Sequence, residues 1–192
     1  MDWRTIIGQA SLKKQLTELV KQNRLSHALL LVGKEGAGAL PLANAFAQYL
    51  VCEQAISSSL DEPCGQCSGC KKSMELVHPD IHFSYPTVTR KPGEKPVATD
   101  FIREWRDFLS QHSYGNLFDW IELIKEKDNS QGKITAEECN DIIRKLSLKS
   151  FESPWKILIL WHPELMGNEG NKLLKLIEEP PPQTILLLIS ES

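Results

Sequence analysis

Four of the five cysteines in this 192-residue chain are spaced as the ligands of one metal ion. They follow the pattern C-x11-C-x2-C-x2-C and are Cys52, Cys64, Cys67 and Cys70. Four thiolates complete the tetrahedral shell of Zn²⁺ and leave no position open for water or a substrate, so such a site is structural. The spacing therefore predicts a small zinc knuckle over residues 52–70, with Gly65 and Gly69 in its tight turns. Surface thiols, a labile disulfide and an iron–sulfur cluster are the alternatives that the spacing leaves open.

A glycine-rich turn between an apolar run and a helical pattern is the second candidate for chemistry. Residues 29–32 (Leu-Leu-Leu-Val) predict a buried strand, and apolar residues recur at helical spacing over residues 41–50. The turn between them contains Gly33, Gly36 and Gly38. Strand, glycine-rich turn and helix together form the frame of a P-loop, whose backbone N–H groups hold phosphates. An ordinary strand-to-helix turn is the plainer alternative.

The two residues that carry the nucleotide chemistry of a P-loop are absent from this frame. In the motif G-x-x-x-x-G-K-[S/T], the lysine reaches the β- and γ-phosphates and the hydroxyl holds Mg²⁺. The corresponding positions here are Ala39 and Leu40. Loss of one charge-assisted contact costs roughly 1.5–3 kcal/mol, so we expect phosphate binding to weaken about 10- to 100-fold. The sequence thus predicts a degenerate P-loop that holds an anion weakly at most and does not bind ATP tightly.

The acidic residues that P-loop ATPases place at the end of a neighbouring strand are missing as well. The apolar run at residues 157–160 is followed by Trp161, His162, Pro163 and Glu164. Glu164 comes after a proline, and we expect it to be a surface or capping residue. We expect His162 to be a structural or exposed histidine. No residue of the chain is therefore predicted to be catalytic.

The elements that must position these residues alternate between strands and helices. Strands are predicted at residues 29–32, 81–85, 157–161 and 184–189, and helices at 12–23, 41–50, 100–128 (one or two), 135–146 and 168–178. Ser11 is expected to cap the first helix, and Cys139 to be a small buried residue. Apolar strands separated by helices predict an α/β fold with a parallel sheet covered on both faces.

Residues 87–133 are predicted to be an insertion in this one-domain chain. The range begins with a stretch rich in proline, lysine and threonine and continues with aromatic residues on one helical face, namely Phe101, Trp105 and Phe108. We expect this face to pack on the domain; a docking surface for another protein is the alternative. Removal of residues 98–130 should leave a folded domain if the insertion is peripheral.

The charge and the apolar content of the chain argue against several classes of protein. The net charge of −3 and the pI of about 6.0 are unlike those of a protein that binds DNA over its whole surface. The first residues, Met-Asp-Trp-Arg, show no signal-peptide pattern, and no apolar run reaches the length of a membrane span. We therefore expect a cytoplasmic protein without a membrane partner, whose cysteines are reduced.

Several stretches of the chain, taken in order, resemble one family. Residues 23–54 read NRLSHALLLVGKEGAGALPLANAFAQYLVCEQ and are followed by CGQCSGC, HPD and NKLLKLIEEPPPQTILLLI. This order resembles the N-terminal AAA+ domain of the bacterial clamp-loader subunits of DNA polymerase III, over most of the chain except about residues 86–133. Within that family, motor subunits (gamma/tau) keep the lysine and the acids, whereas delta prime subunits lack them. Ala39, Leu40, Trp161 and His162 make this chain similar to the delta prime branch.

The resemblance implies a AAA+ (RecA-like) P-loop NTPase fold and zinc at the four cysteines. It implies a subunit of the DNA polymerase III holoenzyme that has no ATPase activity of its own and helps to load the sliding clamp onto primed DNA. Its partners would be gamma/tau and delta subunits in a hetero-pentamer. The lid and collar domains and an arginine that acts in trans would lie beyond Ser192, so the chain is expected to be the N-terminal part of such a subunit.

Two other functions remain open from the sequence. The first is an active P-loop ATPase in which Lys34 replaces the usual lysine, although Lys34 lies on the wrong side of the loop. The second is a zinc-knuckle scaffold or DNA-binding protein outside the clamp loader. The knuckle has no aromatic residue and only Lys71 and Lys72 nearby, which makes it a poor platform for stacking bases.

Overall fold

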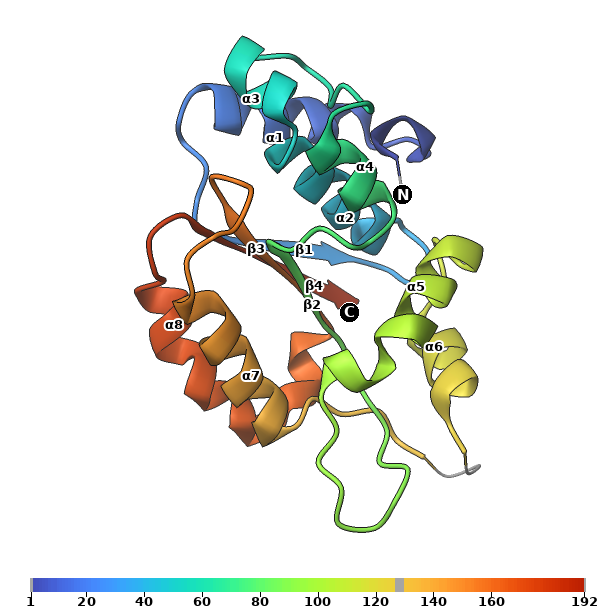
Figure 1. Cartoon of the computed structure of the whole chain (residues 1–192). Helices are drawn as coiled ribbons and strands as arrows, with labels where there is room; N and C mark the ends of the chain where they lie inside the picture. The colour runs from blue at the N-terminus through green and yellow to red at the C-terminus, as the bar shows by residue number, and fades with distance from the viewer. Residues whose placement is uncertain (1, 127–129, 192) are drawn as a thin grey trace.

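A sheet of four parallel strands lies at the centre of the computed structural model, which describes residues 2–126 and 130–191 (Figure 1). The strands are β1 (Ala28–Gly33), β2 (Ile81–Ser84), β3 (Lys156–Trp161) and β4 (Thr184–Glu191), in the order β1-β4-β3-β2. Leu187 of β4 is paired with Leu29 of β1 on one side and with Ile159 of β3 on the other. The continuous apolar runs suit a parallel sheet covered on both faces, except that Leu30 and Val32 of the edge strand β1 are 60% and 59% exposed. The predicted α/β class is confirmed.

Helices cover both faces of the sheet and one of its ends (Figure 1). The first face carries α1 (Ala10–Lys21), α2 (Ala39–Leu50), α3 (Glu53–Ser58) and α4 (Ser68–Met74). The second face carries α7 (Ala136–Ser147), the 3-10 segment η3 (Pro163–Leu173) and α8 (Leu174–Glu178). The short η2 (Ala98–Phe101), α5 (Ile102–Gln111) and α6 (Leu117–Ile124) lie beside the end to which the strands point. A 3-10 turn, η1 (Trp3–Thr5), precedes α1.

Two predicted helices differ from the structure at their ends. α1 begins before Ser11, because Gln9 adopts a left-handed conformation (φ 59°) that fixes the start of the helix without a side-chain cap. The helix predicted over residues 168–178 is divided into η3 and the short α8, and Gly167 (φ 52°, ψ −136°) interrupts η3. In the described part of the chain, no helix is both long and apolar enough to cross a bilayer.

Aromatic rings from residues 98–124, here called the aromatic segment, enter the main core. Trp105 stacks on Tyr85, which follows β2, with ring centroids 4.0 Å apart, and lies 5.4 Å from Trp161 at the end of β3. Trp120 meets Trp105 edge to face at 5.1 Å and donates a hydrogen bond from Nε1 to the Pro86 carbonyl (2.7 Å). The predicted packing of this aromatic face on the domain is confirmed. Residues 127–129 of the predicted insertion lie outside the described residues.

We predict that Trp105→Ala destabilises the domain by about 3–5 kcal/mol, because it removes a fully buried ring and leaves a cavity between Tyr85 and Trp161. The matched control is Phe118→Ala in the same segment, since Phe118 is 69% exposed. Urea unfolding monitored by far-UV circular dichroism measures both. Equal, small effects of the two variants would show that the aromatic segment is peripheral, as the sequence alone suggested for residues 98–130.

A buried carboxylate fixes the connection that precedes β3. Asp80 is 3% exposed and accepts hydrogen bonds from the backbone N–H groups of Phe151, Glu152 and Ser153, the last two at 2.7 Å. Burial favours the neutral acid, but these three donors outweigh burial and lower the pKa of Asp80. The ionised side chain therefore holds the loop that leads into β3.

We predict that Asp80→Asn costs about 2–3 kcal/mol at pH 7, because an amide can offer only one acceptor oxygen to three N–H donors. A carboxylate with a lowered pKa stabilises the fold above its ordinary pKa of about 3.9, and this stabilisation is lost as the pH falls through the native value. The difference between the variant and the wild type should therefore shrink below about pH 4 in urea unfolding. Asp107→Asn, on the exposed face of α5, is the control; a difference unchanged down to pH 2 would contradict this role.

Candidate P-loop and metal centre

The glycine-rich turn has the strand–loop–helix geometry of a P-loop. β1 ends at Gly33, and α2 begins at Ala39 with Gly38 as its N-cap residue. Gly38 has a φ of 90°, in the left-handed region that favours glycine, and Gly36 has a φ of 72°. The start of a 12-residue helix therefore faces the space beyond the turn with its free N–H groups, which is the geometry that can hold an anion.

The side chains at the two diagnostic positions do not face a ligand as a lysine and a hydroxyl would. Leu40 is 2% exposed and belongs to the main hydrophobic core, and Ala39 packs against that core. Neither side chain has a charge or a hydrogen-bonding group, so the first turn of α2 offers an anion only its backbone.

The end of β3 holds an aromatic ring where an acid would be needed. Trp161 is fully buried among the rings of the aromatic segment. His162 is 4% exposed, adopts a left-handed conformation (φ 56°), and its Nδ1 lies 2.7 Å from Oε1 of Glu164. His162 is thus a buried structural residue, and Glu164 is its hydrogen-bonding partner on the surface.

Glu191, the last described residue of β4, joins this group and was not identified from the sequence. Nε1 of Trp161 donates to its Oε1 (3.3 Å), and its Oε2 lies 3.6 Å from Nε2 of His162. Burial raises the pKa of Glu191, and the carboxylates of Glu35 and Glu164 add to the rise against the opposing effect of His162. Three carboxyl groups therefore lie near the strand ends, which disfavours a phosphate there.

Three residues that contact the turn also escaped sequence analysis, because they are far from it along the chain. Nε2 of Gln9 donates to the Ala37 carbonyl (3.0 Å), and Nδ2 of Asn116 donates to Glu35 (3.5 Å). The ring of Tyr114 lies against Gly38: a Cβ atom built on this glycine would be 2.9 Å from Cε1 of the tyrosine. No local pattern marks such contacts.

The four predicted cysteine ligands come together at the other end of α2. Their Sγ atoms all lie within 4.8 Å of one another, and those of Cys64 and Cys70 are 4.0 Å apart. Zn–S bonds of about 2.3 Å place tetrahedral sulfurs about 3.8 Å apart, so the cluster fits a four-coordinate metal ion. These residues can therefore hold one metal ion. Cys139 is far from them in the sequence and fully buried beside Met166, as predicted.

Backbone N–H groups point at the sulfurs and favour their thiolate forms. Cys52 accepts from the N–H groups of Ala55 (3.3 Å) and Cys64 (3.2 Å). At Cys64, burial is outweighed by the N–H groups of Gln66 and Cys67, which lower its pKa to about 7. Burial raises the pKa of Cys52 and of Cys70, so their deprotonation depends on a cation between the sulfurs.

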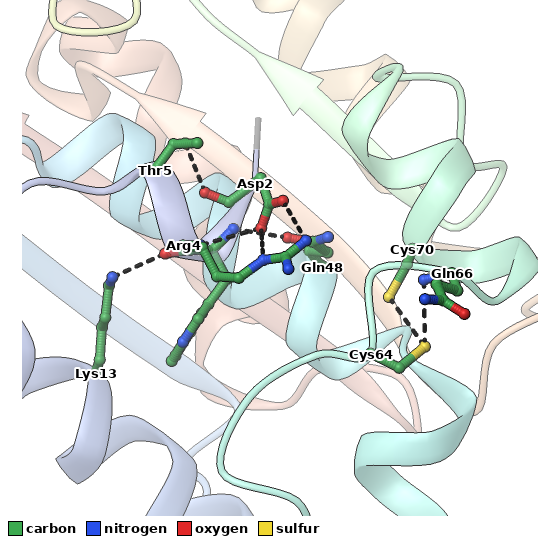
Figure 2. A network of polar contacts seen from close by, with 9 residues as sticks. Asp2, Arg4, Thr5, Lys13, Gln48, Cys64, Gln66 and Cys70 are labelled. Atoms are coloured by element: carbon green, nitrogen blue, oxygen red, sulfur yellow. Dashed lines mark hydrogen bonds and ion pairs between the residues drawn. The ribbon is translucent and has the colours of Figure 1, made fainter.

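Two glycines allow neighbouring parts of the chain to pack closely around the cysteine cluster. A Cβ atom on Gly69 would lie 2.2 Å from the Val51 carbonyl oxygen, so Gly69 allows α4 to approach the end of α2 rather than forming a turn. Gly65 (φ 72°) does form the predicted turn, next to Arg4. Figure 2 shows η1 near Cys64 and Cys70, with the guanidinium of Arg4 paired to the carboxylate of Asp2 (3.0 Å).

The family model and the relatives that match this chain all point to one family. Residues 8–192 match the family model described as "DNA polymerase III, delta subunit". The chain is 28% identical over 184 residues to DNA polymerase III subunit delta' of Bacillus subtilis (95% of this chain, 42% of the relative) and 30% identical over 173 residues to subunit delta' of Escherichia coli K12 (88% and 47%). It is 26% identical to subunit tau of Bacillus subtilis over 95% of this chain and 24% of the relative. The chain thus spans less than half the length of these relatives.

We predict that Cys70→Ser abolishes metal binding, because it removes a buried ligand from a closed four-sulfur shell. A metal ion whose free concentration is 1,000 times its dissociation constant stabilises the fold by about 4 kcal/mol. The variant should therefore unfold at a much lower temperature than the wild type. Metal content by inductively coupled plasma mass spectrometry and thermal unfolding with and without a chelator measure both effects. Cys139→Ala is the control and should keep its metal; Cys70→Ser with wild-type metal content would contradict the site.

Proposed function

The chain belongs to the family described as DNA polymerase III, delta subunit, and on this basis we propose that it is a clamp-loader subunit of delta prime type that does not hydrolyse ATP. It would help the complex to place the sliding clamp on primed DNA. The delta' names of the relatives support this assignment.

The non-catalytic assignment rests on the side chains in the first turn of α2. A P-loop frame is present, but Leu40 is buried in the core and Ala39 offers no charge. The metal-binding acids are replaced at the end of β3 by Trp161, which is buried. Without these groups a phosphoryl-transfer transition state has no electrostatic support.

The role of such a subunit is to be a fixed member of a ring of related domains. Its proposed neighbours are gamma/tau and delta subunits in a hetero-pentamer, with the sliding clamp and primed DNA reached through the complex. Subunit tau of Bacillus subtilis matches the same region of this chain, which supports neighbours of the same fold. Zinc is the metal that we propose for the four cysteines, and the cytoplasm is the proposed location.

The test is calorimetric titration of the protein with ATP and Mg²⁺, on a preparation whose zinc content is assayed. We expect no binding tighter than millimolar and one zinc ion per chain, because the loop has lost about 1.5–3 kcal/mol with the missing lysine alone. Lys34→Ala is the matched variant, since Lys34 is the cation of the loop itself. Micromolar binding by the wild type that this variant abolishes would overturn the proposal in favour of an active ATPase.

A further inference from the structure

The turn at residues 112–116, between α5 and α6, lies against the P-loop. Its Tyr114 ring lies on Gly38, at the N-terminus of α2, so closely that a Cβ atom on the glycine would be 2.9 Å from Cε1 and 3.6 Å from Cδ1 of the ring. Free N–H groups at a helix start are the groups that would face a phosphate. The ring therefore lies next to the N-terminus of α2, where these N–H groups are.

The hydroxyl of Tyr114 fixes the ring from its other end. It accepts a hydrogen bond from the backbone N–H of Ile7 at 2.8 Å. Gln9, two residues further on, donates to the Ala37 carbonyl within the loop (3.0 Å). Tyr114 thus contacts both the N-terminal segment and the P-loop, and Gln9 adds a second, direct contact between these two parts of the chain.

Packing and hydrogen bonds within residues 112–116 hold the turn in place. Gly115 has no room for a side chain, because a Cβ atom there would lie 2.8 Å from Phe108 and 3.0 Å from His112. Its N–H donates to the His112 carbonyl (2.8 Å), and Oγ of Ser113 donates to Leu109 (3.2 Å). Phe108 is itself 1% exposed, so the turn cannot leave the loop as a free flap without disturbing the core.

Polar contacts in the same turn engage the loop itself. Asn116 caps α6 by accepting from the N–H of Asp119 (3.0 Å), and its Nδ2 donates to Oε2 of Glu35 (3.5 Å). Glu35 is one of the acidic groups near Glu191 at the strand ends. A ring therefore lies on Gly38, and carboxylates lie near the same loop.

We propose that residues 112–116 are an intramolecular plug of the P-loop, in which Tyr114 occupies the approach to Gly38 that a nucleotide would need. The inference deepens the proposed function and rests on it: the chain not only lacks the phosphate-binding lysine but also fills the space in front of the loop. The plug joins Ile7, Gly38 and the aromatic segment without any ligand. The subunit would therefore keep one conformation whatever the nucleotide concentration.

The plug is tested by restoring the missing cation with and without the ring. Ala39→Lys returns the lysine at a half-buried position, and ATP with Mg²⁺ and inorganic tripolyphosphate are the probes in calorimetry. We expect A39K/Y114A to bind both probes at least tenfold more tightly than A39K. A39K/Y114F keeps the ring and should match A39K within about twofold.

Each outcome separates the inference from the proposed function. If A39K/Y114A binds no more tightly than A39K, whatever their absolute affinities, the ring does not close the loop and the plug is wrong. If the unmodified protein binds ATP at micromolar concentration, the proposed function fails as well. An adverse result for the variants alone leaves the proposed function standing.

A second measurement covers the case in which A39K/Y114A does not fold. Tyr114→Ala alone removes both the ring that lies on Gly38 and the hydroxyl that accepts from Ile7. Hydrogen–deuterium exchange followed by mass spectrometry should then show at least tenfold faster exchange at Ile7 and faster exchange over residues 33–39, with α7 unchanged. Exchange equal to the wild type at both places would overturn the inference.

Discussion

The ends of parallel strands that point the same way must be covered, because buried apolar strands otherwise meet water at that edge. In this chain aromatic rings cover them: Trp105 lies between Tyr85 after β2 and Trp161 at the end of β3. The aromatic segment is therefore part of the hydrophobic core and is not a peripheral insertion. The positions of α5, of α6 and of the turn between them follow from this packing, and so does the contact of Tyr114 with Gly38.

This edge of a parallel α/β sheet is also where ligands ordinarily bind, so covering it has a chemical consequence. A site for a nucleotide needs exposed N–H groups, a cation and an open space. Here Leu40 and Trp161 are buried, and Tyr114 lies on Gly38. The same side chains that stabilise the domain thus replace the groups that a bound phosphate would need. The packing that stabilises the domain thus also decides which side chains stand at these positions.

Local patterns in the sequence predicted the strands, the P-loop frame and the cysteine ligands, because each depends on spacing within a few residues or on one apolar run. The cysteine cluster was predicted in full, and its four sulfurs meet. The contacts of Gln9, Tyr114 and Glu191 could not be predicted, since they join residues distant in the chain and carry no periodic signal. The start of α1 was misplaced for a local reason: Ser11 suits a cap, but the left-handed Gln9 begins the helix earlier.

The central helix α2 connects the two candidate sites. Every residue from Leu40 to Leu50 is buried, so the helix is held on all sides by the core. Its first residue follows the P-loop, and Cys52 follows two residues after its end. A metal at the cysteines is therefore remote from any phosphate at the loop and cannot take part in its chemistry. What it can do is fix the C-terminal end of α2, as Tyr114 contacts the N-terminal end, so that both sites hold the same helix in one place.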